Sequence, residues 1–387
     1  MTAEHRQIRL LFISSINVRW MHLEWLAREL DRRRFDVSFL LVSIAPRPPF
    51  LEGYLRELGI PFRTLPCKLR PGEILRTVLE IRRHCRRERI DIVHTHIFFA
   101  SLVGLLGARL AGIPVRINTR HHASMNHGKP FYWLDRLTNL LANRIVATSE
   151  ILRRVLQREK APGRKIRLIR LGIDLDRFQC VAADEVSALA RKYNPTGKSP
   201  VIGVIARHIE IKGVQYIIPA FRRLLDRYPQ AYLVLAYATG PYHAALQELL
   251  APIPPDRYLQ IEFEDNVAAL YRIFDLFVHT PIGEEEESFG LTYVEALAAG
   301  VPSVFTLAGV APEFLVDQWN ACIVEHRNSE QIHDALLALL ADPGLREALG
   351  RAGRESAEIF GLGRMIAELE DLYVASFREL ADGGRSS

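Results

Sequence analysis

Residues 287–302 read ESFGLTYVEALAAGVP and follow an apolar run, Leu276 to Thr280, that has the character of a buried strand. A strand that ends near Pro281 would lead through a loop into a helix, which we expect to start around Ser288 or Phe289. The first N–H groups of such a helix lack partners and its dipole is positive there, so the loop is suited to bind an anion. The stretch thus predicts a strand–loop–helix unit of a parallel sheet, with a ligand site at the carboxyl end of the strand.

The same alternation of apolar strand and helix extends in both directions along the chain, which predicts parallel sheets covered on both faces. It is lost only between Asp184 and Pro200, a segment that contains Asn194, Pro195 and Gly197. We therefore expect an α/β protein of two Rossmann-like, doubly wound domains that face a central cleft. The expected bounds are residues 1–183 for the first domain, 184–200 for a linker region, 201–360 for the second domain, and 361–387 for a C-terminal helix, packing back on the first domain, with a polar tail.

Composition places the 387-residue chain among globular proteins, with 49% hydrophobic and 25% charged residues. No apolar run approaches the roughly 20 residues that span a bilayer, and the N-terminal residues do not resemble a signal peptide. The four cysteines are scattered without a CxxC pair, so we expect a cytoplasmic protein without a disulfide framework or a zinc site. Up to Ala190 the chain has 33 basic and 18 acidic residues, and after it 17 and 27. The basic N-terminal half favours an anionic partner surface.

Two groups of charged residues are candidates for a binding site. Residues 203–213 read GVIARHIEIKG, which places Arg207 at a strand end and Lys212 before the next helix, where two cations could neutralise a diphosphate. Glu287 and Glu295 would lie ~12 Å apart on a helix, too far apart to act on one bond as a glycosidase pair does. They could bind hydroxyls at the two ends of one extended ligand. Taken alone, each group could equally be solvent-exposed charges or a helix cap.

Together these stretches resemble glycosyltransferase family 4, the retaining GT-B enzymes, and the resemblance covers nearly the whole chain. The sequence motifs of the family occur here in the same order, at residues 91–96, 146–150, 172–178, 207, 212, 240–241, 266–267, 275–278, 287–295, 299–302, 309, 313 and 320. The resemblance implies transfer of a hexose-type sugar from a UDP- or GDP-sugar donor to a glycan or lipid-linked acceptor, as in cell-envelope or polysaccharide biosynthesis. It implies no bound metal and no cofactor. The first domain would handle the acceptor and the second the nucleotide sugar.

The resemblance also implies roles for single residues. Arg207 and Lys212 would hold the diphosphate, and Glu295 would hold the ribose. Glu287 would contact the transferring sugar. The remaining donor contacts would come from the N–H groups of Phe289, Gly290 and Leu291 and from Asn266 and Val267. Residues 262–267 would border the base. Retention would proceed with the leaving phosphate helping to deprotonate the acceptor.

The first domain contributes a histidine and a loop. Of His121 and His122, His121 is in register with a family histidine near the reacting sugar, although a histidine at a strand end is often only structural. The first loop usually carries paired glycines but has none here. Its residues Ser15, Asn17 and Arg19, with His122, are candidates for acceptor or phosphate contacts. Other departures from the family pattern are Arg170-Leu171, Tyr237-Ala238-Thr239 and Ala308.

Residues 73–87 form an amphipathic helix with an Arg-rich polar face, and Arg32 to Arg34 add a second basic patch. They suggest peripheral contact with an anionic membrane on its cytoplasmic face, or a solvated helix packed on its domain. No nucleic-acid-binding motif is present, so a nucleic acid is not an expected partner. Two alternatives stay open: a catalytically weak sugar-nucleotide-binding scaffold subunit and a GT-B-type sugar-nucleotide epimerase.

Overall fold

The structure, a computed structural model, describes residues 6–15, 19–44, 49–122 and 129–382. Contacts divide the chain into two compact units of similar size. Unit 1 comprises residues 1–172 together with 362–387, and unit 2 comprises residues 173–361. The predicted division at residues 184–200 therefore differs from the compact units, which separate after Gly172 and again after Gly361.

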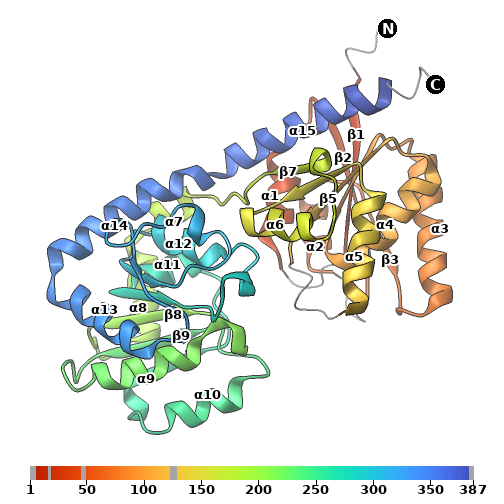
Figure 1. The fold of residues 1–387 in the computed structure, drawn as a ribbon. Coiled ribbons are helices and arrows are strands. Elements are labelled where there is room, and N and C mark those ends of the chain that lie inside the picture. Colours follow the sequence, from red (N-terminus) through yellow and green to blue (C-terminus); the bar gives the residue numbers. More distant parts are fainter. Residues whose placement is uncertain (1–5, 16–18, 45–48, 123–128, 383–387) are drawn as a thin grey trace. The chain divides into compact units, whose positions relative to one another are not determined.

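Unit 1 contains, among its described residues, a seven-stranded sheet in the order β3-β2-β1-β4-β5-β6-β7 (Figure 1). Every neighbouring pair is parallel. The strand order reverses beside β1, as in a doubly wound sheet, and ligands bind at such a reversal at the carboxyl ends of the strands. The strands are β1 (Ile8–Ser14), β2 (Phe35–Ser43), β3 (Phe62–Pro66), β4 (Ile92–His96), β5 (Val115–Arg120), β6 (Arg144–Ala147) and β7 (Ile166–Leu168).

The helices of unit 1 cover this sheet, and β1 is apolar and almost wholly buried because of them. The C-terminal helix belongs to unit 1, where the Tyr373 hydroxyl lies 2.7 Å from Nδ1 of the buried His94. Glu370 of the same helix accepts a hydrogen bond of 2.8 Å from the N–H of Asp31. The helices are α1 (Met21–Glu29), α2 (Leu51–Glu57), α3 (Pro71–Arg87), α4 (Phe98–Ala111), α5 (Lys129–Leu141), α6 (Glu150–Arg158) and α15 (Leu362–Asp382).

Unit 2 has its own parallel sheet, in the order β10-β9-β8-β11-β12-β13 among its described residues (Figure 1). The strands are β8 (Val201–Ile205), β9 (Tyr232–Ala236), β10 (Tyr258–Ile261), β11 (Leu276–His279), β12 (Ser303–Phe305) and β13 (Cys322–Ile323). The helices are α7 (Asp176–Gln179), α8 (Ala183–Tyr193), α9 (Val214–Leu224), α10 (His243–Leu250), α11 (Val267–Arg272), α12 (Leu291–Ala298), α13 (Ser329–Ala341) and α14 (Pro343–Ala357). The prediction of two Rossmann-like parallel-sheet domains is confirmed.

Helix α8 occupies much of the segment in which sequence patterns indicated a linker. Leu189 is its buried residue. The end of α8 is fixed by Lys192 and Tyr193, whose Nζ and hydroxyl lie 3.0 and 2.6 Å from a carboxylate oxygen of Glu264. Such polar contacts with a residue far along the chain cannot be predicted from the local sequence. None of the described helices combines the length and the apolar character that crossing a bilayer requires.

Candidate active site

Glu287 is the centre of a buried polar cluster in unit 2. It follows a short 3-10 helix, Glu284–Glu286, and forms an ion pair with Lys212. Nε2 of His279, the last residue of β11, donates a hydrogen bond of 3.1 Å to the same carboxylate oxygen. Burial alone would raise the pKa of Glu287, but the charge of Lys212 and the His279 hydrogen bond outweigh it and lower that pKa to about 2. The cluster therefore holds a fixed, ionised carboxylate.

Glycines allow the loops around this cluster to approach one another closely. Gly213, directly after Lys212, has φ +72°, and a Cβ there would lie 1.8 Å from the carbonyl oxygen of Thr280. Gly309 has φ +61°, and its Cβ would lie 2.8 Å from Cβ of Glu287. Larger residues would force these loops apart. The loops after β8, β11 and β12 thus meet at the carboxyl ends of their strands.

Helix α12 begins at Leu291, later than the predicted start at Ser288 or Phe289, and this changes the relation of the two glutamates. Gly290 is its N-cap, with φ +89°, and Glu287 has extended backbone before it. The helical spacing expected for Glu287 and Glu295 therefore does not apply. Within the described chain, the N–H groups of Phe289 and Gly290 have no hydrogen-bond acceptor. This helix start offers donors to an anion or a hydroxyl.

Glu295 lies in the second turn of α12 and is partly buried. Its carboxylate accepts a hydrogen bond of 3.1 Å from the hydroxyl of the buried Tyr271. Burial raises the pKa of Glu295, although the Tyr271 hydrogen bond and the charge of Arg177 oppose the shift. Tyr271 thus fixes one carboxylate oxygen in place, and a ligand hydroxyl could approach the other.

Arg207 follows β8 and points its charge into solvent. Its side chain is exposed and makes no hydrogen bond or ion pair with the described residues. The backbone beside it is fixed, since the N–H of His208 donates to the carbonyl of Thr239 at 2.9 Å. Gly240 (φ +147°) would place a Cβ 2.3 Å from the carbonyl oxygen of His208. Arg207 is therefore a cation without a described partner, on a loop whose backbone is fixed by hydrogen bonds and close packing.

Asn266 and Val267 lie at the start of α11. The Asn266 side chain caps this helix by accepting a 3.2 Å hydrogen bond from the N–H of Ala269. Phe263 belongs to the stretch expected to border the base, and its ring meets that of Tyr237 edge to face at 5.8 Å. Tyr237 has φ +59°, which lies in the left-handed region that favours glycine.

The predicted loop residues of unit 1 have partners of their own. Arg19 donates to both carboxylate oxygens of Glu24 at 3.1 and 3.3 Å, and its guanidinium lies 5.6 Å from the Phe50 ring centroid. Ser15 is buried, and its Oγ accepts a 3.4 Å hydrogen bond from the N–H of Ala100. Asn17 falls outside the described residues. A role of this loop in binding phosphate or acceptor stays a prediction.

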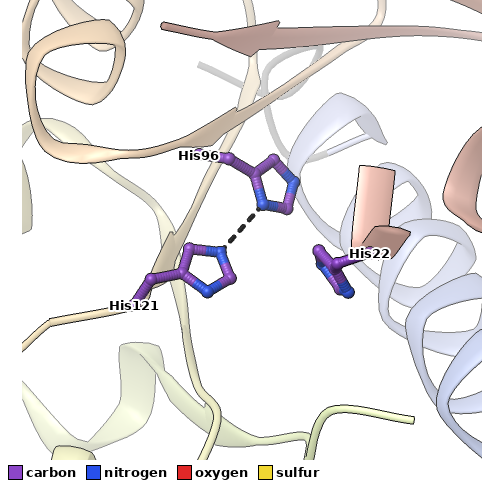
Figure 2. Close-up of side chains that lie close together, drawn as sticks. All are labelled: His22, His96 and His121. Carbon is purple, nitrogen blue, oxygen red and sulfur yellow. Dashed lines mark hydrogen bonds between the residues drawn. The ribbon is translucent and has the colours of Figure 1, made fainter. Parts of the chain in front are cut away.

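His121 and His122 separate at the end of β5. The His122 Nε2 lies 3.3 Å from Oδ1 of Asp135, which also forms a buried ion pair with Arg120. His121 instead joins His22 and His96, two histidines that sequence analysis did not single out (Figure 2). Of the residues predicted for the donor and acceptor sites, direct contacts join Lys212 with Glu287. Lys212, Glu287 and the other donor residues belong to unit 2, whereas the histidines and the first loop belong to unit 1.

Comparisons with known proteins place both units in one family. The family model of "Glycosyl transferases group 1" matches residues 186–356, and that of "Glycosyltransferase Family 4" matches residues 21–177. A D-inositol 3-phosphate glycosyltransferase of Corynebacterium jeikeium is 25% identical over 91% of this chain and 90% of its own. A GDP-mannose-dependent monoacylated alpha-(1-6)-phosphatidylinositol monomannoside mannosyltransferase of Corynebacterium glutamicum is 31% identical, over 48% of this chain and half of its own.

Solved structures agree with the fold. HepE of Anabaena in complex with UDP-glucose superimposes with a TM-score of 0.80 at 18% identity, over 95% of this chain and 100% of its own. The two family models together span most of the chain and reach into both units. The protein is therefore an enzyme of glycosyltransferase family 4 with the GT-B fold.

Proposed function

We propose that the enzyme transfers a hexose-type sugar from a UDP- or GDP-sugar to a glycan or lipid-linked acceptor, with retention of anomeric configuration and without a metal at the donor diphosphate. The observation that carries this proposal is the cluster of Glu287, Lys212 and His279 at the carboxyl ends of the strands of unit 2. The donor class is supported by the relatives, of which one is named GDP-mannose-dependent and one was solved with UDP-glucose.

In the proposed donor complex, charge neutralisation comes from side chains. Arg207 is exposed and uncommitted among the described residues, so it can bind a phosphate without breaking a contact. Lys212 is paired with Glu287, yet its ammonium has three N–H donors and can hold the carboxylate and a phosphate oxygen together. The N–H groups of Phe289 and Gly290 add backbone donors. Two cations and a helix start then supply the stabilisation that a metal would otherwise provide.

At the other end of the donor, Glu295 would accept hydrogen bonds from the ribose. Tyr271 already occupies one of its carboxylate oxygens at 3.1 Å, which orients the other. The base would lie near Asn266 and Val267. The exposed Phe263, which pairs with Tyr237, offers a ring against which a base could stack.

The low pKa of Glu287 supports the proposal of retention. A general base works best when its pKa lies near the operating pH, and a pKa of about 2 makes this carboxylate a weak base. Glu287 is therefore assigned to hold sugar hydroxyls. The bond from the anomeric carbon to the phosphate oxygen breaks, the bond to the acceptor oxygen forms on the same face, and the acceptor proton passes to the leaving phosphate. No enzyme carboxylate needs to take that proton.

The acceptor is proposed to be anionic or membrane-borne, because unit 1 presents basic and apolar surface. Helix α3 packs its apolar face into unit 1 and exposes Arg76, Arg83 and Arg87. A second feature, not expected from the sequence, is the exposure of apolar side chains on helix α5, where Trp133 is 62% and Leu140 72% exposed. Exposed aromatic and aliphatic side chains together with arginines are typical of a helix that binds a lipid surface.

Co-sedimentation with vesicles tests this part of the proposal. The wild-type enzyme should bind vesicles that contain anionic phospholipid more tightly than purely zwitterionic ones, and less so at high salt. Trp133→Ser should weaken this binding. Trp319→Ser, which removes another exposed tryptophan from unit 2, is the matched control. Equal binding by all three proteins, or none by the wild type, would count against a membrane-borne acceptor.

Product analysis tests the reaction itself. Purified enzyme stripped of metal ions is incubated with a panel of nucleotide sugars and acceptors, and NMR of the product gives the configuration at the anomeric carbon. Retained configuration is expected, with a rate that added Mg²⁺ or Mn²⁺ does not change. Inverted product refutes retention, and a rearranged sugar without acceptor indicates an epimerase. Donor binding without transfer or hydrolysis indicates a scaffold subunit.

A further inference from the structure

Three histidines from separate parts of the sequence converge in unit 1. His22 is the second residue of α1, His96 the last residue of β4, and His121 the first residue after β5. One ring nitrogen of each lies within 4.8 Å of the others, and Nδ1 of His96 is 3.0 Å from Nε2 of His121. Figure 2 shows the three rings gathered around a common space. They lie at the carboxyl ends of neighbouring strands, where doubly wound sheets bind ligands.

The hydrogen bonds of this cluster are incomplete. His22 is 3% exposed, and neither of its ring nitrogens has a partner among the described residues; the same holds for Nε2 of the fully buried His96. In the neighbouring buried His94, by contrast, both ring nitrogens have a hydrogen-bond partner. Nδ1 lies 2.7 Å from the Tyr373 hydroxyl and Nε2 lies 2.7 Å from the Thr119 hydroxyl. An unpartnered buried polar group costs about 1–3 kcal/mol. Within the described part of the chain, these three ring nitrogens have no hydrogen-bond partner.

The donor set suits a transition metal. Each of the three side chains offers an imidazole nitrogen, which in the neutral ring has a lone pair that can bind a metal ion. Imidazole nitrogens favour zinc, copper, nickel and iron over magnesium or calcium. For zinc–nitrogen bonds of about 2.0–2.1 Å in tetrahedral geometry, ligand nitrogens lie roughly 3.3 Å apart. The 3.0 Å between His96 and His121 is close to that separation.

We propose that His22, His96 and His121 form a binding site for a divalent transition-metal ion, with Zn²⁺ as its principal occupant. Three protein ligands leave a fourth tetrahedral position for water or another oxygen ligand. His121 is partly exposed while the other two are buried, so an ion can reach the site from the His121 side. The proposal departs from the expectation of a metal-free protein. It also assigns His121 as a ligand instead of a residue that contacts the sugar.

The test is metal binding by the purified, untagged full-length chain after dialysis against a chelator. Titration with Zn²⁺ alone, followed by calorimetry, should give one equivalent bound with micromolar or tighter affinity. Co²⁺ should give the visible absorption of a tetrahedral complex. His22→Ala, His96→Ala and His121→Ala should each weaken binding by more than about 100-fold, since one of three ligand bonds is lost. Zn²⁺ should raise the unfolding temperature of the wild type but not of these variants.

His84→Ala is the matched control. His84 is also a buried histidine in unit 1 whose ring nitrogens have no described partner, but it lies in α3, outside the cluster. This variant should bind Zn²⁺ as the wild type does. His121→Ala, at the most exposed position, keeps the test valid if the buried substitutions prevent folding.

Two results would overturn the proposal: no Zn²⁺ binding at micromolar concentration, or one-equivalent binding that survives all three substitutions. No donor or acceptor is present in the titration, so its outcome is independent of the transfer reaction.

Discussion

Replacing Glu287 by Gln removes the negative charge that Lys212 and His279 contact and keeps the shape of the side chain. The pKa of Glu287 is about 2, against an ordinary value of 4.5. At 1.36 kcal/mol per pKa unit, the ionised carboxylate stabilises the folded state by about 3 kcal/mol at pH 7. Glu287→Gln loses this contribution and leaves a largely buried ammonium unpaired. We expect unit 2 to lose about 3 kcal/mol of stability.

The pH dependence has a defined sign. Because the folded pKa lies below the unfolded one, the contribution is fully present above about pH 4.5 and is lost as the pH falls towards 2. Gln does not titrate. The difference between wild type and variant should therefore shrink from about 3 kcal/mol at pH 7 to about 1.4 kcal/mol at pH 3.

Hydrogen exchange is a suitable assay, because it reports the stability of unit 2 separately in a chain with two units. Peptides from β11 and α12 should exchange roughly 150-fold faster in Glu287→Gln at pH 7. Glu284→Gln, which removes an exposed carboxylate from the same acidic run, should exchange like the wild type. In the double variant with Lys212→Met, the cost should be less than the sum of the single costs. A Glu287→Gln effect below about 0.5 kcal/mol, or one that does not change with pH, would refute the reasoning.

Three further outcomes are expected. Arg207→Ala should weaken donor binding at least about tenfold in calorimetry and leave the unfolding midpoint unchanged, because the side chain has no described partner; an unchanged affinity contradicts its role. Glu295→Ala should abolish transfer, whereas Tyr271→Phe, which removes only the 3.1 Å hydrogen bond, should mainly raise the KM for the donor in steady-state kinetics. Wild-type kinetics in Glu295→Ala would contradict a role of Glu295 in donor binding. Gly213→Ala should lower the stability of unit 2 by about 2 kcal/mol or more in urea unfolding, since a Cβ would lie 1.8 Å from Thr280 and φ is +72°; a neutral effect would mean that the loop can move.

The fold could be predicted because it depends on local patterns. Continuous apolar runs such as β1 and β8 predict strands buried on both faces, and the structure has both strands almost wholly buried. Helix α8 was not predicted, because Glu264, far along the chain, fixes its end. The start of α12 was placed too early because the positive φ of Gly290 is not visible in the sequence.

Some residues of the candidate site could likewise be predicted from the sequence, and others could not. An ordered series of motifs assigns both Lys212 and Glu287 to the donor site, and in the structure the two form an ion pair. His279 was missed, because a histidine at a strand end carries no signal by itself. The cluster of His22, His96 and His121 was missed for a similar reason. Its members are scattered over 100 residues and come together only through the order of β1, β4 and β5 in the sheet.

The assignment of α15 to unit 1 has a consequence for synthesis of the chain. All residues of unit 2, 173–361, leave the ribosome before α15 does. His94 stays without its Tyr373 partner, and Asp31 without Glu370, until the last helix emerges. Domains generally fold as units in the order of their synthesis. Here unit 1 is the first to be started by the ribosome and the last to be completed. A nascent chain stopped before residue 362 holds a finished second half and an N-terminal half that still exposes part of its interior to chaperones.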